Sequence, residues 1–126
     1  MLADELRHVK DREAQLMGIL KIGHETSIRG EGISLAEALE RTGYKSLRKT
    51  FAQNDLTAII LKHPEITSEW LAYSEDKRTG GGWYILAKGE IGQIDNPESI
   101  KHFDAIEEAV SEYVVRELDF WSTVKK

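Results

Sequence analysis

The stretch of sequence that decides the fold is Glu69–Ala87, which reads EWLAYSEDKRTGGGWYILA. Two runs rich in aromatic and aliphatic residues flank a loop of charges and glycines. This pattern predicts a β-hairpin with strands at about 66–73 and 82–88. The glycines at 80–82 give the backbone of this loop of about eight residues the freedom to close. Helical segments precede the hairpin, so the sequence predicts an α+β fold.

The rest of the sheet and its cover follow the hairpin. A third strand is expected at 91–95, so that three strands form an antiparallel meander. Asn96-Pro97 should end the sheet, because proline lacks the amide hydrogen that a β-ladder needs. An amphipathic C-terminal helix of about 16 residues should then pack its apolar side on the meander. The positions on that side are Phe103, Ile106, Val110, Tyr113, Val114, Glu117 and Phe120.

Helical periodicity dominates the first half of the chain. The first helix is expected at 2–22, with a loop containing two glycines at 24–32. Within a single domain of residues 1–126, this first helix (1–23 with its glycine stop) could be semi-independent. It could also pair with a second copy of the chain and form a homodimer. Three further helices are expected, with N-caps at Ser34, Ser46 and Asn54 or Asp55, and ends near Gly43, Gln53 and His63.

Composition narrows the class of protein. The 126 residues, with 40% hydrophobic content, are enough for one domain with its own core. No run approaches the roughly 20 apolar residues of a membrane span, and Met1–Arg12 carries alternating charges instead of the apolar region of a signal peptide. The chain has no cysteine, which excludes disulfides and thiolate zinc sites. We expect a cytoplasmic protein with no cofactor and no membrane partner.

The net charge of −5 is distributed unevenly along the chain. Residues 41–53 hold four basic side chains and no acid, whereas residues 90–124 hold nine acids and two basic residues. Either pole could attract a partner of opposite charge. In the C-terminal helix the acids lie on adjacent turns, and we expect them to form one solvent-facing stripe with Ser111 and Arg116 beside it. The residues of this acidic stripe are Asp104, Glu107, Glu108 and Glu112.

The leading hypothesis is a non-catalytic protein-binding module. In its sharpest version the protein is a small acidic inhibitor, of the immunity or antitoxin type, of a bacterial toxin or nuclease. The acidic stripe would steer a basic partner, and aromatic anchors would hold it. The candidate anchors are Trp70, Tyr73, Trp83 and Tyr84, of which at least two should belong to the core because one face of the sheet is covered. The exposed hairpin loop would add Glu75, Asp76, Lys77 and Arg78 to the partner-binding residues.

A DNA-binding regulator is the alternative, since helices followed by a hairpin outline a winged-helix domain. Residues 34–53 have the dimensions of a helix-turn-helix, in which Lys45, Arg48 and Lys49 would meet phosphates or base edges. The hairpin loop would be the wing. Its acids cancel its bases, however, and the whole chain is acidic, so the sequence favours a protein partner over nucleic acid.

A metal-dependent nuclease is the third and weakest interpretation. Glu75-Asp76-Lys77 matches the end of a motif in which acids hold Mg²⁺ and a lysine supports the attacking water. The match is short, and such a site also needs an acid on a neighbouring strand. The nearest earlier acid outside the predicted hairpin is Glu65, close to its start, and Asp55 lies in a predicted helix. None of the four histidines pairs with another at i+3 or i+4, as helical metal ligands do. We therefore predict no catalytic residue and no metal site, and expect a protein that is not an enzyme.

Overall fold

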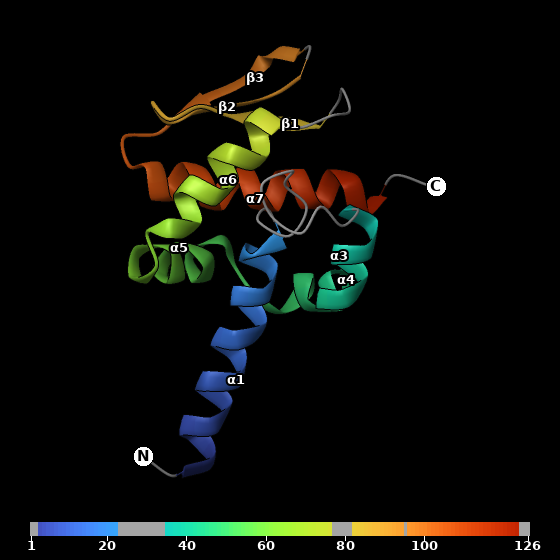
Figure 1. Ribbon diagram of the computed structural model, residues 1–126, viewed down its shortest axis with the longest axis vertical. Helices are drawn as coiled ribbons and strands as arrows, with labels where there is room; N and C mark the ends of the chain where they lie inside the picture. The colour runs from blue at the N-terminus through green and yellow to red at the C-terminus, as the bar shows by residue number, and fades with distance from the viewer. Residues whose placement is uncertain (1–2, 23–34, 77–81, 95, 124–126) are drawn as a thin grey trace.

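The computed structural model describes residues 3–22, 35–76, 82–94 and 96–123, and it has an α+β fold (Figure 1). Its three strands form one antiparallel sheet in the order β1-β2-β3, and the C-terminal helix α7 contacts β1 and β2. The predicted fold class is therefore confirmed. The strands are β1 (Trp83–Ile85), β2 (Glu90–Gln93) and β3 (Asn96–His102); the helices are α1 (Ala3–Leu20), α3 (Leu35–Thr42), α4 (Tyr44–Leu47), α5 (Gln53–Lys62), α6 (Glu65–Asp76) and α7 (Ile106–Thr123), with a 3-10 turn at Arg48–Thr50.

The predicted strand at 66–73 is wrong, because these residues lie in helix α6. Ile66, Trp70 and Tyr73 follow one another at helical spacing, and all three are buried on the side that meets the core. His63 ends α5 with a non-helical backbone (φ −132°, ψ 75°), since the residue before a proline disfavours the α conformation. The Ile66 amide donates to the His63 carbonyl and opens α6. There is consequently no hairpin at 66–88, and the charged segment joins a helix to β1.

The end of the sheet is also corrected. Asn96-Pro97 begins β3 where the sequence pattern predicted an end to the sheet. Proline is tolerated there because β3 is an edge strand, and Asn96 and Pro97 are its first two residues. The meander exists, but it consists of the predicted second and third strands, shifted to 83–85 and 90–93, and a strand that the sequence did not predict.

The expected helix caps differ from those in the structure. Helix α4 begins at Tyr44, directly after Gly43, whose φ of 65° is a conformation that favours glycine. Helix α5 starts after Ala52, and the Asp55 carboxylate accepts a hydrogen bond from the Ala52 amide at 2.8 Å. Ser46, Asn54 and Asp55 are therefore not N-caps. The loop at 24–32 and the Ser34 cap lie outside the described residues.

Helix α7 lies at the centre of the core. Figure 1 shows it passing beneath the sheet, with α5 and α6 beside it. Its predicted apolar positions Val110, Tyr113 and Val114 are fully buried, as expected. Ser111, predicted to face solvent, is also fully buried because α5 covers a second side of α7. Its hydroxyl pairs with the Thr57 hydroxyl at 2.6 Å and donates to the Glu107 carbonyl at 2.8 Å.

Helix α1 packs against the core at its C-terminal end and projects from the molecule at its N-terminal end. Leu16, Ile19 and Leu20 are buried in the core, whereas the first turns extend away from the rest of the molecule in Figure 1. Pairing of α1 with a second copy stays a prediction. None of the helices in the described residues is long and apolar enough to cross a membrane.

Candidate functional site

No helix of the described residues covers the face of the sheet that turns away from α7 (Figure 1). Side chains alternate along the strands, so Ile85 and Ile91 point to α7 and are buried, at 2% and 0% exposure. Their neighbours point the other way. We call this side the outer sheet face; its residues are Tyr84, Glu90, Gly92, Pro97, Ile100 and His102.

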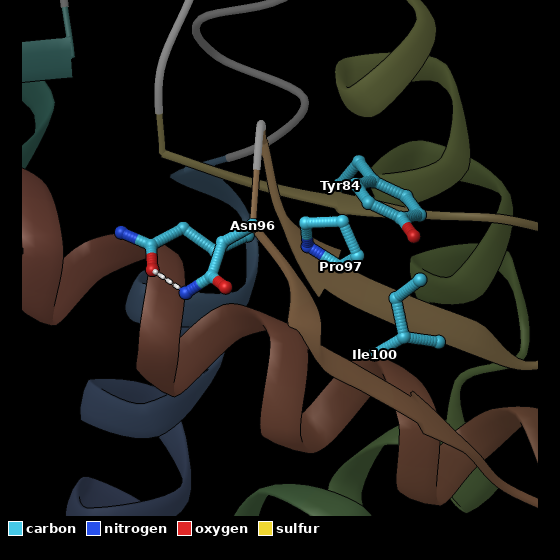
Figure 2. Close-up of a pocket in the computed structure, with 5 residues that line it drawn as sticks. Tyr84, Asn96, Pro97 and Ile100 are labelled. Atoms are coloured by element: carbon cyan, nitrogen blue, oxygen red, sulfur yellow. Dashed lines mark hydrogen bonds between the residues drawn. The ribbon is translucent and has the colours of Figure 1, made fainter.

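A shallow open pocket lies at one end of the outer sheet face. Its volume is about 180 Å³, and Tyr84, Pro97 and Ile100 supply its apolar walls (Figure 2). Gln93 and Asn96 form its polar rim, and the Asn96 amide donates to the Gln93 side-chain oxygen at 3.3 Å. Small-molecule sites usually measure about 300–1,000 Å³. This pocket has room for one or two side chains of a partner.

The pocket depends on the position of the Tyr84 ring, which lies across Gly92. A Cβ atom at residue 92 would come within 2.8 Å of the Tyr84 hydroxyl, so only glycine leaves room for the ring. The Tyr84 hydroxyl donates to Glu90 Oε2 at 2.8 Å. Burial raises the pKa of the Tyr84 phenol, and the carboxylate of Glu90 adds to this shift. The same carboxylate lies 3.7 Å from Lys88 Nζ and 3.8 Å from His102 Nε2.

We expect Gly92→Ala to destabilise the protein by about 1–3 kcal/mol, because the added methyl group must displace the Tyr84 ring. Urea denaturation measures the change. In a Tyr84→Ala background the same substitution should cost less, because the ring is gone, and the two changes should not be additive. Equal costs in the two backgrounds would show that Tyr84 does not fill the space above Gly92.

An irregularity in β3 places Pro97 and Ile100 at the pocket. Between the pairs Ile91↔Lys101 and Gln93↔Asn96, β2 advances by two residues (91 to 93) and β3 by five (96 to 101). The Ser99 hydroxyl fills the gap: it accepts from the Gln93 amide at 2.6 Å and donates to the Asn96 carbonyl at 2.7 Å. This bulge bends β3 and keeps the pocket open.

A buried carboxylate fixes the opposite edge of the sheet. Glu117 of α7 is fully buried; its Oε2 accepts from the Tyr73 hydroxyl at 2.8 Å and its Oε1 from the Trp83 amide at 2.7 Å. Burial raises the pKa of the Tyr73 phenol, and the charge of Glu117 raises it further. The Tyr113 hydroxyl donates to the Trp83 carbonyl at 3.2 Å, and the Ile85 amide donates to the Ser74 hydroxyl at 3.1 Å. Side chains of α6 and α7 thus occupy three outward backbone groups of β1: the Trp83 amide, the Trp83 carbonyl and the Ile85 amide.

The four candidate anchor residues differ in their exposure and in their location in the fold. Trp70 and Tyr73 are core residues, with exposures of 0% and 8%, which confirms that at least two of the four are internal. Trp83 is partly buried beneath the Arg116 guanidinium, which lies 4.9 Å from its ring. Tyr84 is the one that lines the pocket.

The acidic stripe on α7 is shorter than predicted. Asp104 and Glu108 are exposed, and Glu107 is partly exposed. The Glu112 side chain is only 13% exposed and pairs with Lys101 at 3.2 Å and Arg116 at 3.1 Å. Acids near the start of a helix are stabilised by the helix dipole. This effect alone can explain why Glu107 and Glu108 occur in the first turn of α7, with no need for a binding protein.

The other predicted binding residues are dispersed. Glu75 and Asp76 form the last turn of α6 and not a hairpin loop, and Lys77 and Arg78 lie outside the described residues. The structure therefore removes the wing on which the winged-helix interpretation depended. No group of three or more potential metal ligands occurs among the described residues.

Arg48, one of the basic side chains of residues 41–53, forms an ion pair within the molecule. Arg48 Nε lies 2.9 Å from Asp119 Oδ1, and the Tyr44 hydroxyl donates to the same oxygen at 2.6 Å. The hydrogen bond from Arg48 to Asp119 raises the pKa of the Arg48 guanidinium. Lys45 and Lys49 are exposed, so DNA binding by this segment stays a prediction.

The pocket was missed at the sequence level, because Pro97 and Ile100 were placed outside the sheet. Ile100, three residues after Pro97, could have signalled an edge strand with an apolar outer side. No protein-family model matches the chain, and comparison with curated proteins and with solved structures found no match.

Proposed function

We propose that the protein is a non-catalytic protein-binding module that uses the outer sheet face. The observation that supports this most is the apolar pocket formed by Tyr84, Pro97 and Ile100, with 41% of Ile100 left exposed. An aromatic anchor at the centre and polar groups at the rim are typical of protein interfaces. The pocket volume of about 180 Å³ suits an aliphatic or aromatic side chain of the partner.

Acidic side chains on the sheet and at its junction with α7 favour a basic partner. Glu90 lies on the outer sheet face, Glu98 is exposed on β3, Asp104 lies between β3 and α7, and Glu108 is in the first turn of α7. A negative surface of this kind accelerates association with a positively charged protein. We therefore propose, more specifically, an acidic inhibitor of the immunity or antitoxin type that binds a basic bacterial toxin or nuclease.

Photo-crosslinking from position 100 tests this proposal. A photoreactive amino acid replacing Ile100 should form one stoichiometric adduct in the native host, whereas the same probe replacing Leu61 should not. Leu61 is the matched control because it is also an exposed aliphatic residue, at 62%, but lies on α5.

The affinity of variants for the purified partner then tests the proposal. Ile100→Asp should weaken the affinity by about tenfold or more, because a charge replaces an apolar contact, and Leu61→Asp should leave it unchanged. Equal effects of the two substitutions, or co-purified DNA with no protein partner, would contradict the proposal.

A further inference from the structure

Two arginine side chains of the described residues are each held by the same two groups, an aromatic ring and a carboxylate. The guanidinium carbon lies 4.9 Å from the ring centre in one case and 5.5 Å in the other, while Nε lies 3.1 Å and 2.9 Å from a carboxylate oxygen. The residues are Arg116 with Trp83 and Glu112, and Arg48 with Phe51 and Asp119. A planar guanidinium can lie over a ring and still direct an N–H group to a carboxylate.

Tyr84 and Glu90 present the same two groups on the outer sheet face. The Tyr84 ring lies across Gly92 and lines the open pocket, so part of the ring is accessible to a partner (Figure 2). The Tyr84 hydroxyl donates to Glu90 Oε2 at 2.8 Å, which places the carboxylate at the hydroxyl end of the ring. Pro97 and Ile100 continue the apolar surface beside the ring.

The basic residues beside Glu90 leave its second oxygen available. Glu90 Oε1 lies 3.7 Å from Lys88 Nζ and 3.8 Å from His102 Nε2, and both distances exceed that of a hydrogen bond. Both basic side chains are 68% exposed, so they are hydrated and compete only weakly for the carboxylate. Glu90 Oε1 can therefore accept a hydrogen bond from a donor that a partner supplies.

We propose that the outer sheet face binds an arginine side chain of the partner, an inference that rests on the proposed function and names the partner's anchor residue. The guanidinium lies over the Tyr84 ring and donates to Glu90 Oε1. The aliphatic stem of the arginine packs against Pro97 and Ile100, as the stems of long basic side chains do on apolar surfaces. The site thus accommodates both the apolar and the charged part of one side chain.

Other side chains match the site less well. Lysine carries a compact, strongly hydrated charge, and it lacks the planar group that stacks on a ring while it bonds to a carboxylate. A purely apolar side chain would fill the pocket but offer no donor to Glu90. Arginine is therefore the side chain that uses all the groups present.

Nuclear magnetic resonance titration of the purified chain tests this inference, with Nα-acetylarginine amide as the probe. Backbone amide resonances of the outer sheet face should shift, with a Kd in the millimolar range because a single side chain makes few contacts. Nα-acetylcitrulline amide has nearly the same shape without the charge and should bind about tenfold more weakly. Nα-acetyllysine amide should also bind more weakly than the arginine probe. Equal binding of the arginine and citrulline probes, or no shift of these resonances, would overturn the inference.

Variants of the protein locate the binding site. Glu90→Gln should weaken binding of the arginine probe about tenfold, because it removes the charge and retains an oxygen that can accept from Tyr84. Lys88→Ala should strengthen binding about twofold, because a competing cation is lost. Glu40→Gln, at an exposed position of α3, is the matched control and should leave the affinity unchanged. Equal losses for Glu90→Gln and Glu40→Gln would mean that general charge attraction holds the probe, which contradicts the inference.

This inference and the proposed function fail in different ways. If a partner is cross-linked from position 100 but the arginine probe does not bind, the proposed function stands and the arginine anchor is rejected. If the probe binds at Glu90 but no partner is cross-linked, the arginine site stands and the proposed function is rejected.

Discussion

Trp70→Ala is expected to lower the free energy of unfolding by about 3–5 kcal/mol, as truncation of a large buried aromatic residue does. Trp70 is fully buried, and its ring makes edge-to-face contacts with Tyr73 at 5.2 Å and Tyr113 at 6.0 Å between centroids. Its indole nitrogen donates to the Leu20 carbonyl at 2.8 Å, so one side chain connects α6, α7 and the end of α1. Equilibrium unfolding in urea measures the loss.

Two variants on the same helix make this result interpretable. Trp70→Phe retains an aromatic ring and loses the hydrogen bond, so it should cost less than alanine. Glu75→Ala, at an exposed position of α6, should stay within about 0.5 kcal/mol of the wild type. A loss below about 1 kcal/mol for Trp70→Ala would mean that α6 does not pack as described.

Glu117→Ala should destabilise the protein by about 3–5 kcal/mol, since it leaves the Tyr73 hydroxyl and the Trp83 amide buried without their acceptor. The loss also removes one of the two hydrogen-bond links between α7 and Trp83 of β1, so the sheet should separate from the helices more readily. Hydrogen exchange of the Trp83 and Tyr84 amides should accelerate, and urea denaturation gives the total cost.

Conservative variants separate the hydrogen bonds of Glu117 from its packing. Glu117→Gln keeps the volume but has a single accepting oxygen for two donors, so its cost should lie between that of alanine and zero. Tyr73→Phe removes one donor and should cost about 1 kcal/mol. If Glu117→Gln matched the wild type, the carboxylate would not be needed to hold β1.

The error at 66–73 shows where composition and periodicity disagree. Ile66, Trp70 and Tyr73 are residues typical of strands, and composition favoured a strand. Their spacing of four and three residues is that of a helix, and burial of one helical side decided the outcome. Periodicity was the better signal here. The same signal correctly predicted α7, which contains six of the seven predicted positions; Phe103 precedes the helix.

The sheet illustrates a second limit of predicting structure from local sequence. Pro97 was correctly judged unable to donate to a ladder, but an edge strand needs donors on one side only. Whether a strand is an edge depends on the arrangement of the whole sheet, which the local sequence does not contain. The predicted end of the sheet therefore became the start of its longest strand.

The candidate site was predicted only in part. Tyr84 was among the candidate anchors, and Asp104 and Glu108 are exposed as expected. The pairs Tyr44–Asp119 and Tyr73–Glu117 join residues that are 75 and 44 positions apart, and no local pattern indicates such contacts. Glu112 and Arg48 consequently looked available at the sequence level, although both are engaged in internal ion pairs.

The closed edge at β1 has a consequence for the size of any assembly. A sheet with two open edges can add copies indefinitely and grow into a fibre. Here the side chains of Glu117, Tyr113 and Ser74 bond to the Trp83 amide, the Trp83 carbonyl and the Ile85 amide, so these groups of β1 are not open to a strand of another molecule. The buried network of α7 therefore opposes fibre growth through the β1 edge as well as supporting the fold.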